Sequence, residues 1–424
     1  MTSEPRKFCE YLEYRDNNLF LEEKDLKKIS EEYGTPLFCY SLNEIKKKFL
    51  EFKESISGLN ASIFFATKAN YNPLIISFLA NLGSGADVVS AGEIKQVLAS
   101  GVKPDKIVFS GVGKTNDEIN YAIKNKIKQI NVESIEEIDD IIDVQKNYRE
   151  CVDISLRVNP DIDASTHSKI STGRSGDKFG IPLNDIIEIF EKYKSTKEIN
   201  INGLAVHIGS QITEINPFEK AFKQLKSLIN QIISKGHDLQ KLDLGGGIGI
   251  VYTDNKTISL SSYRNIVEKY FKSFDLELLF EPGRFLVGSS GILLSKVIRI
   301  KENSNNKFLI LDCGMNDLLR PSLYDAKHQI LPVVFSDQAN KVEYDVVGPI
   351  CESSDNFGKK IALGKLKKDD LVVLTSTGAY GSSMSSYYNC RKPANEILID
   401  KKKSLSSRKM YSVNELYLDN KLDE

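Results

Sequence analysis

The chain has little of what marks several classes of protein. Its 57 basic and 58 acidic residues leave almost no net charge, which argues against a nucleic-acid surface or a polybasic membrane anchor. No apolar run is long enough to span a bilayer, and the segment from Met1 to Glu10 lacks the apolar core of a signal peptide. We therefore expect a cytoplasmic protein that acts on a small molecule, without a nucleic-acid or membrane partner.

Cysteine is also sparse. The six cysteines are scattered singly, and no two of them stand at the short separation that zinc sites use. The sequence therefore predicts neither a metal site nor a disulfide scaffold. These residues are Cys9, Cys39, Cys151, Cys313, Cys351 and Cys390.

What the chain does have is a long alternation of short apolar runs with helical stretches. A helix is predicted over 217–235, because apolar residues recur there at helical spacing between Pro217, a residue common in the first turn of a helix, and Gly236, a residue common at helix ends. Roughly eight such units predict a closed (β/α)₈ barrel over 37–284. The runs expected as strands are 37–40, 62–67, 87–90, 107–110, 129–132, 153–158, 204–208, 241–244 and 277–280.

The pattern of predicted secondary structure changes after about Phe285, where predicted strands follow one another without long helices between them. A chain of 424 residues has room for a barrel of about 250 residues plus a smaller domain. We therefore expect 285–424 to form a C-terminal all-β domain, and 1–36, which lies outside the repeat, to join it. The strands expected there are 293–300, 308–312, 342–347 and 371–375.

Lys68 closes the apolar run that begins at Ile63. An ammonium at the edge of a core strand is costly unless it is paired, and desolvation lowers its pKa toward the neutral amine that attacks a carbonyl. Such a lysine can hold an aldehyde cofactor as a Schiff base. A lysine that only extends out of a strand end is the plainer interpretation, and the neighbouring motifs decide between the two.

Several other polar residues follow predicted strands, where the reactive groups of a barrel lie. Gly245, Gly246 and Gly247 would let backbone N–H groups approach a phosphate closely. Glu281 would keep a pyridine nitrogen protonated, which makes the ring a strong electron sink and favours decarboxylation. Together with Lys68, these residues predict a pyridoxal 5′-phosphate (PLP) site. His207 is a candidate to stack on the ring, or else a hydrogen-bonded core histidine.

Two further charged residues stay ambiguous in the sequence. Arg157 ends the run 153–158, and Asp87 lies in the run 87–90. Either residue could contact a cofactor or form a structural ion pair.

The ordered motifs resemble the diaminopimelate decarboxylases, which belong with ornithine and arginine decarboxylases and alanine racemase among the fold-type III PLP enzymes. The resemblance runs nearly from end to end of the chain. The motifs that carry it are 65–70, 87–93, 157–160, 178–181, 207–211, 245–247, 281–284, 320–324, 351–355 and 378–381.

This resemblance implies a role for each motif residue. Lys68 would be the Schiff-base lysine and His207 the stacking residue. Ser210, Gly245 to Gly247, Gly283 and Arg284 would surround the phosphate. Tyr380 would touch both cofactor and substrate.

The resemblance also implies a homodimer with shared active sites. In the family, the β domain of one subunit completes the active site of the other, so Cys351 and Glu352 would act in trans. We expect Cys351 to reprotonate the α-carbon after CO₂ is lost.

The substrate implied is meso-2,6-diaminopimelate, which would lose CO₂ at its D centre to give L-lysine in the last step of lysine biosynthesis. Arg284, Arg320 and Tyr324 can hold the distal carboxylate, and Glu352 can hold the distal ammonium. Considered without the motif, Arg320 and Tyr324 would more readily be interpreted as ordinary salt-bridge and core residues.

Three alternatives remain open in the sequence. A related decarboxylase could act on ornithine, carboxynorspermidine or a carrier-linked glutamyl group, and Arg320, Tyr324 and Glu352 argue against it. A racemase of similar fold is disfavoured by Glu281, which makes too strong an electron sink. A non-enzymatic PLP carrier would lack a second domain that supplies Cys351 and Glu352.

Overall fold

The computed structural model describes residues 5–163, 173, 176–335, 341–408 and 410–418. These residues form two compact units. The barrel unit comprises Phe49–Ile250 and Lys256–Phe285, and the β unit comprises the chain up to Lys48, Val251–Asn255 and the chain from Leu286 onward. The boundary between Lys48 and Phe49 falls inside a helix, α2 (Leu42–Ser55).

A closed parallel barrel is the centre of the barrel unit. In the described part of the chain, eight parallel strands follow one another around the ring, and pairing between β8 and β9 closes it. A short strand, β10 (Ile181–Pro182), adds to β9 outside the ring. The predicted barrel is thus confirmed. Its strands are β5 (Ala61–Ala66), β6 (Gly85–Val88), β7 (Ile107–Phe109), β8 (Gln129–Val132), β9 (Val152–Asn159), β11 (Ile199–Ala205), β12 (Lys241–Asp243) and β13 (Glu277–Phe280).

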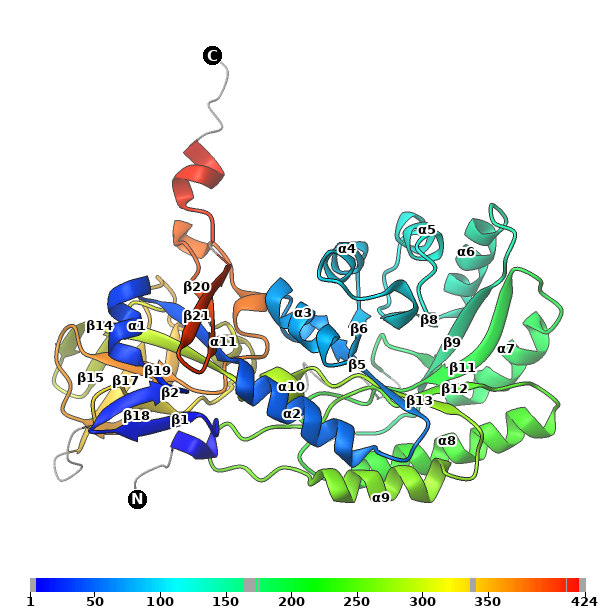
Figure 1. Cartoon of the computed structure of the whole chain (residues 1–424), viewed down its shortest axis with the longest axis horizontal. Coiled ribbons are helices and arrows are strands. Elements are labelled where there is room, and N and C mark those ends of the chain that lie inside the picture. Colours follow the sequence, from blue (N-terminus) through cyan, green and yellow to red (C-terminus); the bar gives the residue numbers. More distant parts are fainter. Residues whose placement is uncertain (1–4, 164–172, 174–175, 336–340, 409, 419–424) are drawn as a thin grey trace, which may run out of the picture. The chain divides into compact units, whose positions relative to one another are not determined.

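Helices connect the barrel strands and lie outside the ring (Figure 1). Their ends follow local capping rules: at α5, for example, Thr115 and Glu118 form a reciprocal capping box. The helix predicted over 217–235 is found as α8. The connecting helices are α3 (Pro73–Asn81), α4 (Ala91–Ala99), α5 (Asn116–Lys124), α6 (Ile135–Gln145), α7 (Ile186–Tyr193), α8 (Asn216–Ser234) and α9 (Leu260–Phe271). A short helix, α10 (Arg284–Val287), follows the last barrel strand, β13.

The interior of the barrel is packed rather than open. Phe64, Val108 and Leu279 come from three different strands and form one buried cluster. Because parallel strands are covered on both faces, their middle residues are apolar and the polar residues gather where the strands end. The carboxyl ends of the parallel strands therefore share one rim, and the candidate site is built there.

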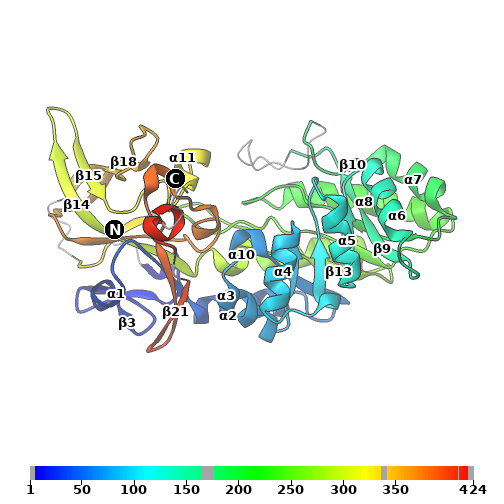
Figure 2. The ribbon, with the colours of Figure 1, turned by 90° about the horizontal axis from the view of Figure 1, so that it is seen from above.

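The β unit is organised around a mixed sheet with the path β18-β17-β15-β14-β4-β20-β21, and β16 and β19 are attached to it through β14. Figure 2 shows β14 and β15 as a long hairpin. All four strands expected in this half are present. The strands are β14 (Gly291–Glu302), β15 (Lys307–Leu311), β16 (Ile330–Pro332), β17 (Lys341–Val347), β18 (Asn356–Gly364), β19 (Leu371–Leu374), β20 (Asn395–Asp400) and β21 (Lys403–Arg408).

The expectation that the run 37–40 opens the barrel is wrong. This run forms β4 (Leu37–Ser41), which pairs with β14 and β20 in the sheet of the β unit. All five residues of β4 are buried, and a fully buried apolar strand carries no sign in its own sequence of which sheet it will join. The eight remaining expected runs each overlap one strand of the barrel, although 87–90 and 204–208 share only their first two residues with β6 and β11.

The segment before β4 forms a small antiparallel sheet of its own, β1 (Leu12–Arg15), β2 (Asn18–Leu21) and β3 (Lys24–Asp25), followed by α1 (Leu26–Tyr33). Leu12, Leu19 and Leu26 from this segment pack in one buried cluster with residues of β4, β14 and β20. This segment thus shares the core of the β unit. No helix among the described residues has the length and apolar character needed to cross a membrane.

Candidate active site at the carboxyl rim of the barrel

Lys68 lies in a single helical turn, Thr67–Ala69, directly after β5. Its Nζ is 2.8 Å from Oδ2 of Asp87, which lies one residue before the end of the neighbouring strand β6 and is fully buried. The register explains this contact, because Ala66 pairs with Asp87 across the two strands. The ammonium of Lys68 is therefore paired, and the ambiguous Asp87 is its partner.

The three adjacent glycines follow β12 and approach neighbouring backbone closely. A Cβ atom would lie 2.4 Å from the Val206 carbonyl oxygen at Gly245 and 2.3 Å from the Glu281 carbonyl oxygen at Gly246. Gly245 and Gly247 also have positive φ, at 62° and 104°. No side chain fits here, so glycine is required by the backbone packing itself.

Glu281 follows β13 and lies beside the glycine loop, where its N–H donates to the Gly245 carbonyl at 2.7 Å. Its carboxyl group is hydrogen-bonded to that of Asp243. Burial, followed by the charges of Asp243 and Asp87, raises the pKa of Glu281 well above its usual value. Within the part of the chain that the structure describes, Oε1 of Glu281 is buried and has no hydrogen-bond partner.

His207 stands two residues after β11 and is half-buried. The N–H of Gly246 lies 3.2 Å from its Nδ1. Desolvation, followed by the positive charges of Lys68 and Arg157, lowers the pKa of His207 well below its usual value. The imidazole is therefore neutral near pH 7, and because Nδ1 accepts a hydrogen bond, the ring proton belongs on Nε2.

Arg284 opens α10, and Gly283 stands immediately before it. Arg284 is buried, and its Nη2 donates to Oγ of Ser210 at 3.0 Å. Gly283 packs against β5, since a Cβ there would lie 3.0 Å from the Cβ atoms of Ala66 and Ala69. The residues predicted to surround a phosphate thus come from three loops, after β11, β12 and β13, and the buried Arg284 ties the first of these loops to the third.

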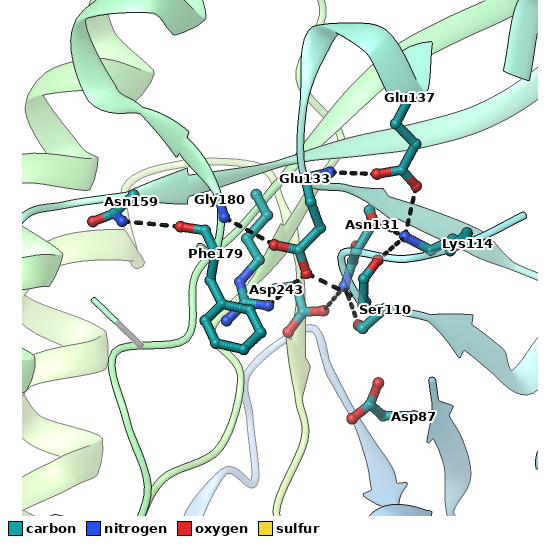
Figure 3. A network of polar contacts seen from close by, with 12 residues as sticks. Asp87, Ser110, Lys114, Asn131, Glu133, Glu137, Asn159, Phe179, Gly180 and Asp243 are labelled. Carbon is teal, nitrogen blue, oxygen red and sulfur yellow. Dashed lines mark hydrogen bonds and ion pairs between the residues drawn. The ribbon is translucent and has the colours of Figure 1, made fainter. Parts of the chain in front are cut away.

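Arg157, the other ambiguous residue, belongs to a second buried network. Its Nη1 donates to Oε1 of Glu133 at 2.6 Å, and its guanidinium lies 4.9 Å from the ring centre of Phe179. Glu133 Oε2 also accepts from the Gly180 N–H at 2.9 Å (Figure 3). Arg157 thus helps to fix the segment at Phe179 and Gly180.

Other predicted residues lie in the β unit, and Cys351 and Glu352 form an exposed turn there. Asn389 Oδ1 accepts from the Cys351 N–H at 3.0 Å, and the Tyr388 hydroxyl donates to Glu352. Behind the turn, the buried Asp355 accepts from the Ile350 N–H at 2.7 Å. Short polar contacts therefore hold this turn on both sides.

Arg320 and Tyr324 lie on one short helix, α11 (Arg320–Tyr324). Arg320 is buried, its Nη1 is 3.0 Å from Nε2 of His328, and its guanidinium lies 4.4 Å from the ring centre of Tyr252. Tyr324 is half-buried. Tyr380, also half-buried, has a positive φ of 57°, which is uncommon for a tyrosine and typical of a functional turn.

The structure therefore brings one group of predicted residues together at the barrel rim and holds a second group in the β unit. The first group is Lys68, His207, Ser210, Gly245, Gly246, Gly247, Glu281, Gly283 and Arg284. The second group is Arg320, Tyr324, Cys351, Glu352 and Tyr380.

Three residues that support the site were missed in the sequence. Asp243 is the buried last residue of β12, Asn131 is buried within β8, and Glu133 is buried directly after β8. A carboxylate within the short run 241–244 was a usable signal, because a charge in a core strand needs a partner. Nothing in the sequence identified Asn131 as that partner, since the two residues are far apart along the chain.

The rim fits PLP on observations of this structure. Glu281 offers a buried acceptor oxygen that lacks a protein partner among the described residues, and Lys68 offers the amine. The Gly245–Gly247 loop and the Arg284–Ser210 pair offer N–H, guanidinium and hydroxyl donors for a phosphate. By contrast, the described residues contain no cluster of three histidine, cysteine or acidic residues that could hold a metal ion.

Comparison with known proteins agrees with this chemistry. The pyridoxal-binding domain of the pyridoxal-dependent decarboxylases matches residues 42–288. The chain is 41% identical to diaminopimelate decarboxylase from Zymomonas mobilis, over 96% of this chain and 97% of the relative. It is 40% identical to the Haemophilus influenzae enzyme of the same name, over 96% and 98%.

Solved structures give the same result. Diaminopimelate decarboxylase from Helicobacter pylori, complexed with L-lysine, superposes with a TM-score of 0.90 at 40% identity, over 93% of this chain and 98% of that one. The enzyme from M. jannaschii, in co-complex with L-lysine, has a TM-score of 0.92 at 33% identity, over 98% of each chain.

Proposed function

Because the chain belongs to the diaminopimelate decarboxylase family, we propose that it removes CO₂ from the D centre of meso-2,6-diaminopimelate to give L-lysine. It is a PLP-dependent carboxy-lyase. The observation that carries the proposal is the buried Glu281 beside the Lys68–Asp87 pair, since both the carboxylate and the amine are needed for this chemistry.

We assign the binding of the cofactor to the barrel rim. Lys68 would hold the aldehyde carbon, and the Asp87 carboxylate, 2.8 Å from Nζ, would accept the proton that the Lys68 ammonium must lose before its amine can attack. The N–H groups of Gly245 and Gly246 already donate to Asp243 and His207, so we expect Gly247 to offer its N–H to the phosphate.

His207 and Glu281 would set the electronic state of the site. When bound, PLP supplies an electron sink for the pair of electrons left by the departing CO₂. Glu281 would hold a proton at the pyridine nitrogen through Oε1. His207, neutral and fixed through Nδ1, can lie against an aromatic face without adding a charge there.

Cys351 would return a proton to the α-carbon. It is an exposed thiol whose backbone is held by Asn389, so the side chain can be offered to a substrate. Cysteine is a suitable donor because its pKa lies close enough to neutrality for a transfer in either direction.

The distal end of the substrate carries one ammonium and one carboxylate. We assign the ammonium to Glu352 and the carboxylate to Arg320, Arg284 and Tyr324, with Tyr380 touching both cofactor and substrate. The contacts of Arg320 with His328 and Tyr252 would hold its guanidinium in a fixed orientation.

We also propose a homodimer in which Cys351 and Glu352 of one subunit serve the barrel of the other. The exposure of these two residues supports this arrangement, since a proton donor that works in trans must lie at the surface of its own subunit. Light scattering should give twice the chain mass of 47.6 kDa, and a monomer that is fully active would contradict the proposal.

We place the reaction in the cytoplasm, and the free state of all six cysteines, each within the described ranges, supports a reducing compartment. Cell fractionation would test this location. Recovery of the protein outside the cytoplasm would overturn it.

The experiment that tests the function is CO₂ release by the PLP-loaded protein from meso-diaminopimelate, with LL-diaminopimelate, ornithine, arginine and lysine in parallel. We expect lysine to form from the meso isomer alone. Activity on another amino acid with silence on diaminopimelate would keep the PLP site and show that Arg320, Tyr324 and Glu352 are misassigned.

A further inference from the structure

Asp243, at the end of β12, has no place in the roles assigned so far, yet it is 1% exposed and heavily hydrogen-bonded. Its Oδ1 accepts from the Gly245 N–H at 2.8 Å, and its Oδ2 accepts from Nδ2 of Asn131 at 2.9 Å (Figure 3). It also shares a hydrogen bond with the carboxyl group of Glu281. This aspartate therefore joins the glycine loop, the strand β8 and the proposed cofactor carboxylate.

The hydrogen bonds of Asn131 fix which of its atoms faces Asp243. Gln129 Nε2 donates to Asn131 Oδ1 at 2.7 Å, which assigns that atom as the oxygen. The Asn131 amide then directs its N–H groups to Ser110 at 3.1 Å and to Asp243. Asn131 can only donate to Asp243, and a donor stabilises the carboxylate form.

Two carboxyl groups form a hydrogen bond with each other only when one of them carries a proton. Asp243 accepts N–H donors at both of its oxygens, so the negative charge belongs on Asp243. Glu281 receives no such donors, and its Oε1 has no partner among the described residues. The proton of the pair therefore belongs to Glu281, on the oxygen that faces Asp243.

We propose that Asp243 is a positioning residue that shares one proton with Glu281 and thereby reserves Oε1 of Glu281 for the pyridine nitrogen of the cofactor. This inference rests on the cofactor role proposed for Glu281. The pair then carries a single negative charge, which matches the single positive charge of a protonated ring nitrogen.

Other charged and titratable groups face this pair from neighbouring elements. Lys68, after β5, lowers the proton affinity of Glu281, and Asp87, on β6, raises that of both carboxyl groups. Burial, followed by the charge of Asp243, raises the pKa of Tyr263 on α9, so this phenol stays protonated. Around Glu281, the positive charge of Lys68 is outweighed by the negative charges of Asp87 and Asp243. The pair therefore keeps its shared proton at pH values above the usual pKa range of a carboxyl group.

The test uses the full-length protein, stripped of PLP and again after reconstitution, in thermal melts over a range of pH. A buried carboxyl with a raised pKa stabilises the fold below its unfolded pKa, and that stability is lost as pH rises through the folded pKa. The wild-type melting temperature should therefore fall as pH rises from about 5 toward the raised folded pKa of Glu281. The melting temperature of Asp243→Asn should fall less over the same pH range, because Glu281 releases its proton at lower pH when Asp243 no longer carries a negative charge.

Asn131→Ala should shift the curve in the opposite direction. It removes a donor to the Asp243 carboxylate, so the pair holds its proton more tightly and the loss of stability extends to higher pH. This second variant leaves both carboxyl groups in place, and it keeps the proposal testable if Asp243→Asn does not fold.

Asp153→Asn is the matched control. Asp153 is also a barrel-strand carboxylate, but it is ion-paired to Lys241 at 2.6 Å, and its pKa is lowered rather than raised. Asp153 is charged in the folded and the unfolded chain throughout this pH range. The plot of melting temperature against pH for Asp153→Asn should therefore have the same slope as that of wild type.

A purely structural Asp243 would also give a parallel displacement for Asp243→Asn, and that result would overturn the proposal. In the reconstituted enzyme we expect kcat for Asp243→Asn to fall about tenfold with KM nearly unchanged. The melts of the stripped protein need no substrate, so their outcome is independent of whether diaminopimelate is the substrate.

Discussion

The two groups of site residues differ sharply in their surroundings. At the barrel rim the functional groups are buried or half-buried and are paired with one another, as in Lys68 with Asp87 and Glu281 with Asp243. In the β unit, Cys351 and Glu352 are exposed and are held by a few short contacts from the 388–389 turn. The barrel thus fixes the protonation states of the groups that would contact the cofactor, whereas the β unit exposes Cys351 and Glu352, the side chains proposed to act on the substrate.

This difference separates two tasks of a decarboxylase. Holding a cofactor in one protonation state needs a low dielectric and fixed partners, which only a packed interior provides. Delivering a proton and gripping a distal substrate end needs side chains that remain accessible. Substitutions in the barrel should therefore change the cofactor and turnover together, and substitutions in the β unit should leave the cofactor intact.

The largest effect is expected from Lys68→Ala. Loss of the amine should remove the visible absorption band of the bound cofactor and reduce kcat/KM by more than about 10⁴-fold. Lys128→Ala is the control, since Lys128 also pairs with a barrel carboxylate, Glu277, at 2.8 Å but has no proposed role. An unchanged spectrum in Lys68→Ala would contradict the assignment.

Glu281→Gln should reduce kcat by about 10²- to 10³-fold, because an amide cannot share a proton with Asp243, so the negative charge of the pair can no longer move to the oxygen that faces the pyridine nitrogen. The cofactor should remain bound through Lys68 but show an altered visible spectrum. A variant with wild-type kcat would remove Glu281 from the electronic role.

Cys351→Ser tests the role of the β unit. We expect kcat to fall about 10²-fold, since a hydroxyl is a much weaker acid, while the cofactor spectrum stays as in wild type. Cys390→Ser, at another exposed cysteine of the β unit, should leave turnover unchanged. Near-normal turnover of Cys351→Ser would exclude this thiol as the proton donor.

Tyr388→Phe should give a smaller effect confined to substrate binding. It removes the hydroxyl that donates to Glu352, so KM for diaminopimelate should rise about threefold to tenfold at constant kcat. Glu352→Gln should raise KM further and should abolish the effect of the tyrosine substitution in the double variant. Additive effects would show that Tyr388 does not act through Glu352.

The pH dependence at His207 should be the smallest effect. Its lowered pKa means that the folded chain resists protonation, so its contribution to stability is present above the unfolded pKa of about 6.5 and is lost as pH falls. The melting temperature of His207→Gln should therefore fall less than that of wild type as the pH is lowered. Equal slopes would show that His207 protonates normally.

The sequence predicted the barrel because its strands are separated by helices of ordinary length, and it predicted the rim residues because they follow those strands. It could not assign β4, whose five buried residues fit either sheet. It also could not pair Asp243 with Asn131, because β12 and β8 are far apart in the sequence. It could not pair Arg157 with Glu133, because that contact depends on the register of β8 against β9.

The most direct test of the division of tasks is complementation between two inactive variants, Lys68→Ala and Cys351→Ser. Mixed and allowed to exchange subunits, equal amounts should recover about a quarter of wild-type lysine formation, because half of the dimers then contain one site with an intact Lys68 and an intact Cys351 from opposite subunits. Recovery of that size would support a barrel that holds the cofactor and a β unit that serves its partner. No recovery above the separate variants, although subunit exchange is demonstrated, would contradict it.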